Sequence, residues 1–193
     1  YIKLVHILIA KIQHYFIFFK RVNYIWTNMK KNKILNKQEI EDKIKRISYE
    51  IYEENFDNKS VIICGIEKNG SIIAKKIIKE LKSICNIQVE FISIELDKKR
   101  PLNTVKINSP KKNIKDKAII LIDDVSNTGK TLIYVINKLI KFEPKKINTA
   151  VLVNRDHTLF PIKINFIGLS LSTSINNHID VKLNNNDVGA YLT

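Results

Sequence analysis

Two adjacent carboxylates, Asp123 and Asp124, follow a run of apolar residues and precede a Gly-Lys-Thr triplet at residues 129–131. The triplet belongs to the phosphate-binding P-loop, GxxxxGK[ST], which also requires a glycine five residues before the Gly-Lys pair. This sequence has Asp124 at that position, and a carboxylate there would repel the phosphates that the loop must enclose. The sequence therefore excludes a P-loop nucleotide-binding site.

The residues that follow the acid pair still form a pattern that suits a phosphate. Hydroxyl groups and a glycine at the start of a helix present donors to an anion, and the helix dipole favours negative charge there. The stretch at residues 126–131, called the cradle below, is too short for a triphosphate but fits one monoester phosphate. The adjacent carboxylates can accept hydrogen bonds from vicinal hydroxyls or hold a divalent cation, so a ribose 5-phosphate matches both features. The candidate phosphate-binding residues are Ser126, Asn127, Thr128, Gly129, Lys130 and Thr131.

Apolar periodicity predicts the elements that position these residues. Apolar residues recur at helical spacing in segments 35–56, 71–84 and 131–142. The first of these helices has Asn36 as its expected N-cap, with Glu39 completing a capping box. Runs of β-branched or alternating residues predict strands at 60–65, 89–96, 102–107, 117–123, 147–154 and 163–169. This alternation predicts an α/β domain with a parallel sheet, in which ligands bind beyond the carboxyl ends of the strands, where the acid pair lies.

Length and composition favour one domain with a basic surface. The chain has 193 residues, of which 45% are hydrophobic, and it can bury one sizeable core. Its 33 Lys and Arg residues against 19 Asp and Glu residues give a net charge of +14, which suits RNA or phosphate-bearing substrates. The lysines are spread over every segment, so a general compositional bias is favoured over a dedicated nucleic-acid patch. Cys64 and Cys85 lack disulfide or metal-site spacing and indicate buried or incidental thiols in a reducing cytoplasm.

Residues 1–28 form a separate basic and apolar segment. Its lysines interrupt the apolar run, which excludes a signal peptide and a spanning helix but leaves an amphipathic helix at a membrane surface open. The sole methionine is Met29. We therefore expect residues 1–28 to be a non-native or disordered extension and residues 29–193 to form the functional domain, with no membrane partner.

The stretch IILIDDVSNTGKT, residues 119–131, resembles the signature with which type I phosphoribosyltransferases bind 5-phosphoribosyl 1-pyrophosphate (PRPP). The resemblance extends from about residue 35 to residue 191. It implies a type I phosphoribosyltransferase-like parallel sheet flanked by helices, with a small hood. It also implies that Asp123 and Asp124 are the catalytic residues, holding the ribose hydroxyls, that Mg²⁺ arrives with PRPP, and that the protein is a homo-oligomer.

Two further segments are similar to the parts of that family that bind pyrophosphate. CGIEKNGSIIAKKI, residues 64–77, resembles the pyrophosphate loop, and ELDKKRP, residues 95–101, falls where the family has a mobile loop. The usual loop has Lys or Arg just before its glycine, where this sequence has an asparagine. The implied pyrophosphate-binding residues are Glu67, Lys68, Asn69, Gly70 and Arg100.

The segment VLVNRDHTLFPIKINFIGLSLSTS, residues 151–174, resembles the hood of the pyrimidine operon attenuators that are also uracil phosphoribosyltransferases. The resemblance implies that Phe166 stacks on the base, that Ile167 and Gly168 offer backbone groups to its edge, and that Arg155 belongs to the same site. The implied activity is uracil phosphoribosyltransferase, a pentosyltransferase of pyrimidine nucleotide salvage.

Two alternatives remain. Hypoxanthine-type enzymes have an aspartate where this sequence has Asn127 and a lysine where it has Asn154; an amide cannot act as a general base, so a pyrimidine is favoured over a 6-oxopurine. The second alternative is an RNA-binding regulator of pyrimidine genes with little catalysis. The attenuators bind messenger RNA through a basic face that includes their first helix, and Lys43, Lys45 and Arg46 lie on the comparable helix here.

Overall fold

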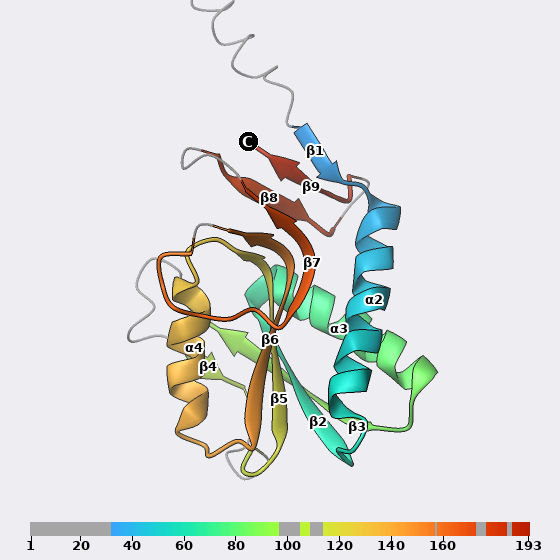
Figure 1. Cartoon of the computed structure of the whole chain (residues 1–193), viewed down its shortest axis with the longest axis vertical. Helices are drawn as coiled ribbons and strands as arrows, with labels where there is room; N and C mark the ends of the chain where they lie inside the picture. The colour runs from blue at the N-terminus through green and yellow to red at the C-terminus, as the bar shows by residue number, and fades with distance from the viewer. Residues whose placement is uncertain (1–31, 97–104, 109–113, 157, 173–176, 185–186) are drawn as a thin grey trace, which may run out of the picture. The chain divides into compact units, whose positions relative to one another are not determined.

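The computed structural model describes residues 32–96, 105–108, 114–156, 158–172, 177–184 and 187–193 (Figure 1). Apart from Asn32, the described residues belong to one compact unit, Lys33–Thr193. The expected extension at residues 1–28, the predicted pyrophosphate ligand Arg100 and residues 102–104 of a predicted strand all lie outside the described residues.

The main sheet confirms the α/β prediction. Its strands are β2 (Ser60–Ile66), β3 (Gln88–Glu95), β4 (Lys106–Ile107), β5 (Ala118–Ser126), β6 (Lys146–Arg155) and β7 (Phe166–Leu171). Their spatial order is β4-β3-β2-β5-β6-β7, and every pair is parallel except β3 with β4 (Figure 1). Because β3 lies on one side of β2 and β5 on the other, the chain changes direction there. The carboxyl ends of β2 and β5 therefore flank the topological switch point at which open α/β sheets bind ligands.

In the described part of the chain three helices cover the sheet, with α2 (Lys37–Asn55) and α3 (Glu67–Ile84) on one face and α4 (Lys130–Ile140) on the other (Figure 1). The predicted capping box of α2 is confirmed. Asn36 Oδ1 accepts a hydrogen bond from the Glu39 amide at 3.0 Å, and Glu39 Oε2 accepts one from the Asn36 amide at 2.7 Å. The reciprocal bonds satisfy two backbone donors that the first turn of a helix leaves without partners.

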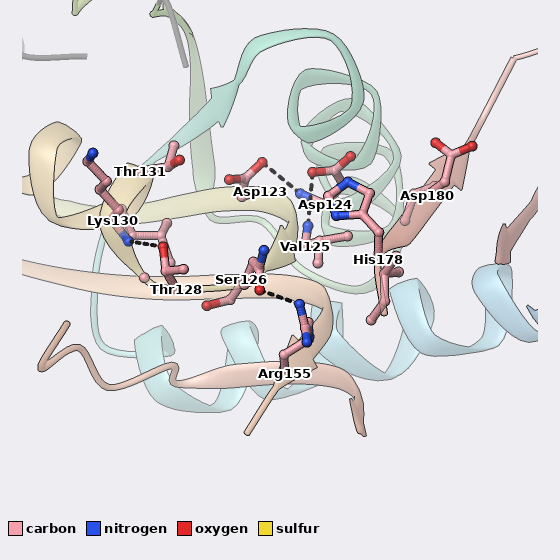
Figure 2. A pocket seen from close by; sticks show the side chains of 15 residues that line it. Asp123, Asp124, Val125, Ser126, Thr128, Lys130, Thr131, Arg155, His178 and Asp180 are labelled. Carbon is pink, nitrogen blue, oxygen red and sulfur yellow. Dashed lines mark hydrogen bonds between the residues drawn. The ribbon is translucent and has the colours of Figure 1, made fainter. Parts of the chain in front are cut away.

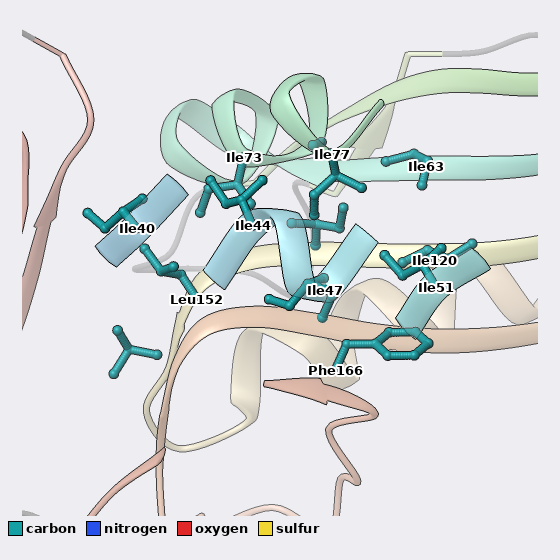
Figure 3. Close-up of a cluster of buried hydrophobic side chains, with 14 of the residues drawn as sticks. Ile40, Ile44, Ile47, Ile51, Ile63, Ile73, Ile77, Ile120, Leu152 and Phe166 are labelled. Atoms are coloured by element: carbon teal, nitrogen blue, oxygen red, sulfur yellow. The ribbon is translucent and has the colours of Figure 1, made fainter. Parts of the chain in front are cut away.

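The core follows the alternation of side chains along the central strands. Ile63 and Ile120 pack under α2 and α3, whereas Ile62 and Ile119 face the α4 side, and all four are fully buried. Figure 3 shows the isoleucines of α2 and α3 meeting those of the sheet. Continuous apolar runs in β2 and β5 are thus explained by burial on both faces.

A second, three-stranded sheet forms the hood and corrects its predicted location. It contains β1 (Asn32–Leu35), β8 (Ile179–Lys182) and β9 (Gly189–Leu192) in the order β1-β9-β8, with β8 and β9 antiparallel. The segment 151–174, which was expected to be the hood, instead supplies the second half of β6 and all of β7 of the main sheet.

Two element boundaries near the acid pair also differ from the prediction. Strand β5 continues through the acid pair to Ser126, because its pairing with β6 extends to the Ser126–Asn154 register. Helix α3 begins at Glu67 and not at residue 71, so residues 67–70 form its first turn and not a free loop. No helix among the described residues has the length and apolar character needed to cross a membrane.

Candidate active site

A pocket of about 380 Å³ lies at the carboxyl edge of the main sheet (Figure 2). Its lining comes from three places: residues 123–132 at the end of β5 and the start of α4, Arg155 at the end of β6, and residues 178–181 at the start of β8. The structure thus brings the predicted acid pair and all six predicted phosphate-binding residues into one site.

The acid pair is held in place by backbone and side-chain donors. Asp123 is only 3% exposed, and its Oδ1 accepts a hydrogen bond from the Asp124 amide at 2.9 Å. Asp124 Oδ1 accepts from the Val125 amide at 2.9 Å, and its Oδ2 accepts from Asn69 Nδ2 at 2.7 Å. Both carboxylates therefore have fixed orientations before any ligand binds, which reduces the reorganisation that binding requires.

The start of α4 has the properties of an anion site. Gly129 has a φ of 79°, and an added Cβ would approach Ile162 Cγ2 to 2.6 Å, so the turn into the helix requires glycine. The N-cap residue Gly129 has no side chain to cap the helix, and the Thr128 hydroxyl accepts a hydrogen bond from the Lys130 amide at 3.3 Å. The Ser126 hydroxyl lines the pocket and is buried, and its oxygen has no hydrogen-bond partner in the described part of the chain. Open helix N–H groups beside a hydroxyl form a suitable cradle for one phosphate.

Arg155 and Asn127 form a pair on the pocket wall. Arg155 is 5% exposed, and its Nη1 donates a hydrogen bond to Asn127 Oδ1 at 2.6 Å (Figure 2). A guanidinium has donors only, so the amide oxygen must face Arg155 and the amide nitrogen must point elsewhere. Asn127 therefore lines the pocket with an amide whose orientation is set by Arg155.

The four predicted pyrophosphate residues that the structure describes, residues 67–70, are not in the lining of this pocket. Glu67 has a φ of 42°, in the left-handed region that non-glycine residues seldom adopt, and its Oε1 accepts a hydrogen bond from the Leu96 amide at 3.1 Å. Glu67 and Lys68 line a neighbouring pocket of about 420 Å³ at the ends of β2 and β3. Gly70 packs on β5 so closely that an added Cβ would lie 2.7 Å from Ile122 O.

The predicted base-binding residues of β7 lie outside the lining of this pocket. Phe166 is 6% exposed and pairs with Ala150 within the sheet, and its ring packs in the core under α2 (Figure 3). The carbonyls of Ile167 and Gly168 accept hydrogen bonds from Arg46 Nη2 at 2.6 and 3.0 Å. The ring and both carbonyls are engaged away from the described pocket, so its lining does not include these three residues, and their role in binding a base stays a prediction.

Residues 178–181 also line the pocket, and sequence reasoning missed them. His178 and Asp180 are labelled in Figure 2, and Ile179 and Val181 complete this part of the lining. The His178 amide and carbonyl pair with Thr193 at 2.7 and 2.8 Å, which fixes the start of β8 against the end of β9. The apolar-polar alternation of Ile-Asp-Val-Lys at residues 179–182 was the one signal available, and it is only four residues long.

An open parallel sheet with an acid pair and an anion cradle at its switch point defines the class of α/β domains that bind phosphorylated ligands at that edge. Within that class, residues 31–186 match the family model described as the phosphoribosyl transferase domain. The chain therefore belongs to the phosphoribosyltransferase family, and the resemblance proposed from the sequence is confirmed.

Relatives and solved structures agree with this assignment. The bifunctional protein PyrR of Leuconostoc mesenteroides is 33% identical over 160 residues, which cover 79% of this chain and 91% of that protein. The bifunctional protein PyrR of Fusobacterium nucleatum is 32% identical over 158 residues, covering 78% of this chain and 89% of that protein. A hypoxanthine-guanine phosphoribosyltransferase from Bacillus anthracis has a TM-score of 0.69 at 17% identity, covering 84% of this chain and 97% of that one, which confirms the type I fold.

Proposed function

We propose that this protein transfers the 5-phosphoribosyl group of PRPP to a nucleobase, with uracil as the favoured base, and releases pyrophosphate. The observation that carries the proposal is the combination, in one pocket, of the oriented acid pair and the uncapped start of α4. These two features match the two ends of a ribose 5-phosphate, since one accepts hydroxyl hydrogens and the other donates to a phosphate.

The proposed reaction breaks the bond between C1 of the ribose and the pyrophosphate oxygen and forms a bond from C1 to a ring nitrogen of the base, whose N–H proton passes to the leaving pyrophosphate or to solvent. Positive charge develops on the ribose ring as pyrophosphate leaves. Asp123 and Asp124 would hold the ribose hydroxyls and place negative charge near that ring, while the start of α4 would anchor the 5-phosphate. Catalysis would then come from positioning and fixed electrostatics, with no covalent intermediate on the protein.

The donor set of the site fits Mg²⁺ that arrives with the substrate. The described residues contain no group of three or more His, Cys, Asp or Glu side chains that could hold a metal by themselves. Carboxylate oxygens suit a hard cation, so Asp123 and Asp124 could complete a coordination shell supplied mainly by PRPP and water. When bound, Mg²⁺ would neutralise charge on the leaving pyrophosphate.

The pocket wall formed by Asn127 and the start of β8, which we assign to the base, supports a pyrimidine as that base. It combines apolar side chains of β8 with Asn127, whose amide is oriented by Arg155 and cannot serve as a general base. Relatives named as bifunctional PyrR proteins point in the same direction. The likeness to hypoxanthine-guanine enzymes is a likeness of fold at 17% identity, and 6-oxopurines remain the alternative bases.

A direct assay tests the proposal. Pyrophosphate release from PRPP is measured with uracil, hypoxanthine, guanine and xanthine offered separately, in the presence of Mg²⁺. We expect uracil to give the highest kcat/KM. A higher kcat/KM for hypoxanthine, guanine or xanthine would indicate that the base is a 6-oxopurine. If none of the four bases reacts, the catalytic proposal is overturned in favour of a regulatory role.

The second candidate function is RNA binding, because the relatives carry the word bifunctional in their names. Lys45 is exposed on α2 and available to a phosphate backbone. Arg46, which was expected to join it, is already ion-paired with Glu50 and bonded to two carbonyls of β7. The basic face on this helix is therefore narrower than the sequence predicts.

A further inference from the structure

We propose that Asn69 is a positioning residue that holds Asp124 and strand β8 together, so that one side chain joins the ribose side of the pocket to its base side. The inference rests on the proposed function for the meaning of those two sides. It departs from the sequence-based expectation, in which Asn69 was itself a ligand for pyrophosphate.

The geometry of the Asn69 amide carries the proposal. Asn69 Nδ2 donates to Asp124 Oδ2 at 2.7 Å and to the Val181 carbonyl at 2.8 Å. A carboxylate and a carbonyl are both acceptors, so the amide nitrogen must be the atom between them, and both of its hydrogens are used. An amide whose donors are both engaged has none left for pyrophosphate.

The two bonds connect three elements that are far apart in the sequence. Asn69 lies in the first turn of α3, Asp124 near the end of β5, and Val181 in β8. The position of Asn69 is itself fixed, because its neighbour Gly70 packs against the β5 backbone with no room for a Cβ. Both partners line the pocket, whereas Asn69 does not, so it acts on a ligand through them.

A neutral amide has a consequence that a cation at residue 69 would not have. Lys or Arg there would pair with Asp124 and offset its charge, whereas Asn69 orients the carboxylate and leaves the charge in place. Each Asp124 oxygen then accepts one hydrogen bond from the protein, from Val125 N or Asn69 Nδ2. Since a carboxylate oxygen can accept two, each retains capacity for a ribose hydroxyl.

Kinetic coupling between substitutions at Asn69 and Asp124 tests the hydrogen bond between these two residues. Asn69→Leu keeps the approximate size of the side chain and removes both donors, and Asn137→Leu, at an exposed asparagine of α4, is the matched control. We expect Asn69→Leu to lower kcat about tenfold and to raise KM for the base, with little change in the control. If Asn69 acts through Asp124, the double variant Asn69→Leu, Asp124→Asn should have a kcat less than about twofold below that of Asp124→Asn alone. Losses that multiply independently would overturn the inference.

Hydrogen exchange tests the hydrogen bond from Asn69 to the Val181 carbonyl, and it does not require the protein to be catalytically active. Amides of residues 179–182 are expected to exchange several-fold faster in Asn69→Leu than in the wild type, while β2 amides stay protected. If Asn69→Leu fails to fold, Asn69→Ser takes its place. Its short hydroxyl cannot donate to both acceptors, so the amides of residues 179–182 are again expected to exchange faster than in the wild type. Unchanged exchange in β8 overturns the inference even if the enzyme is active. Faster exchange in a protein inert with all four bases supports the link and refutes only the proposed function.

Discussion

Arg155 takes the oxygen end of the Asn127 amide, because a guanidinium can only donate hydrogen bonds. The amide nitrogen, a donor, is then the end that is left for a ligand, whereas a carboxylate would offer only acceptors. A donor suits a carbonyl oxygen of an oxo-substituted base, and an acceptor suits a ring N–H. We therefore expect any discrimination between bases at this position to depend on the pair and not on Asn127 alone.

Asn127→Asp tests that discrimination. The new carboxylate keeps a partner in Arg155 but offers the base an acceptor and a charge in place of the amide donor. We expect the ratio of kcat/KM for uracil to that for hypoxanthine to fall at least about tenfold, on the order of 1.4 kcal/mol. Pyrophosphate release with each base measures the ratio, and Asn137→Asp on α4 is the control. A ratio equal to that of the wild type would show that Asn127 does not contact the base.

Asp124→Asn tests the acid pair. The substitution keeps the size of the side chain and removes a negative charge beside the developing positive charge of the ribose. Turnover should fall at least about tenfold, on the order of 1.4 kcal/mol of barrier. Steady-state kinetics with PRPP varied give kcat and KM, and Asp57→Asn, at an exposed site after α2, should be neutral. Unchanged kinetics would contradict the ribose-site assignment.

At the scale of elements, long periodic segments were predictable and short ones were not. Helices α2 and α4 and strands β2, β3, β5 and β6 were predicted because each buries a sustained apolar face or run. Strands β1, β8 and β9 have four residues each and depend on pairing with one another, and such tertiary contacts have no local sequence signal.

The same reason explains which parts of the site were predictable. The acid pair and the cradle at residues 126–131 are contiguous in the sequence, and their chemistry follows from residue type and spacing. The wall at residues 178–181 comes from the small sheet, so it could not be predicted without that pairing. The burial of Phe166 in the core could not be predicted, because an aromatic residue in a strand looks the same in the sequence whether it faces a ligand or a core.

Burial of strand β2 sets the chemistry of its cysteine. Cys64 is fully buried, and desolvation raises its pKa to about 12, because burial disfavours the charged thiolate. In the native protein at pH 8 we expect a thiol reagent to leave Cys64 unmodified and to label at most Cys85, and to label both after denaturation. Two rapidly reacting native thiols would contradict the burial of β2.

The same shift predicts how stability depends on alkaline pH. Since the folded pKa of Cys64 lies above the unfolded value of about 8.5, the unfolded state loses its proton first. The free energy of unfolding should therefore be unaffected by this group below about pH 8 and should decrease from about pH 9 towards pH 12. Urea unfolding across this range should show a smaller decrease for Cys64→Ala than for the wild type.

At the scale of the whole molecule, the net charge of +14 predicts attraction to any polyanion. Binding to unrelated RNA should weaken steeply as salt is raised, because each contacted phosphate releases counterions. Titrations of a pyrimidine-operon leader and a shuffled RNA of equal length at several salt concentrations separate the two cases. Equal affinities would indicate charge alone. A preference for the leader that persists at high salt would support regulation, and Lys45→Glu should then weaken it.

The small sheet of β1, β8 and β9 also affects the order in which the parts of the pocket can form during synthesis. It pairs β1, at the start of the described chain, with β9, at its end, and its third strand β8 supplies one wall of the pocket. During synthesis, the acid pair and the cradle leave the ribosome well before residues 178–193 do. The main sheet can form from residues 60–171 at that stage, whereas the pocket wall at residues 178–181 must wait for β8 and β9. A nascent chain would therefore acquire its acid pair and cradle first, and this wall only after β9 has been made.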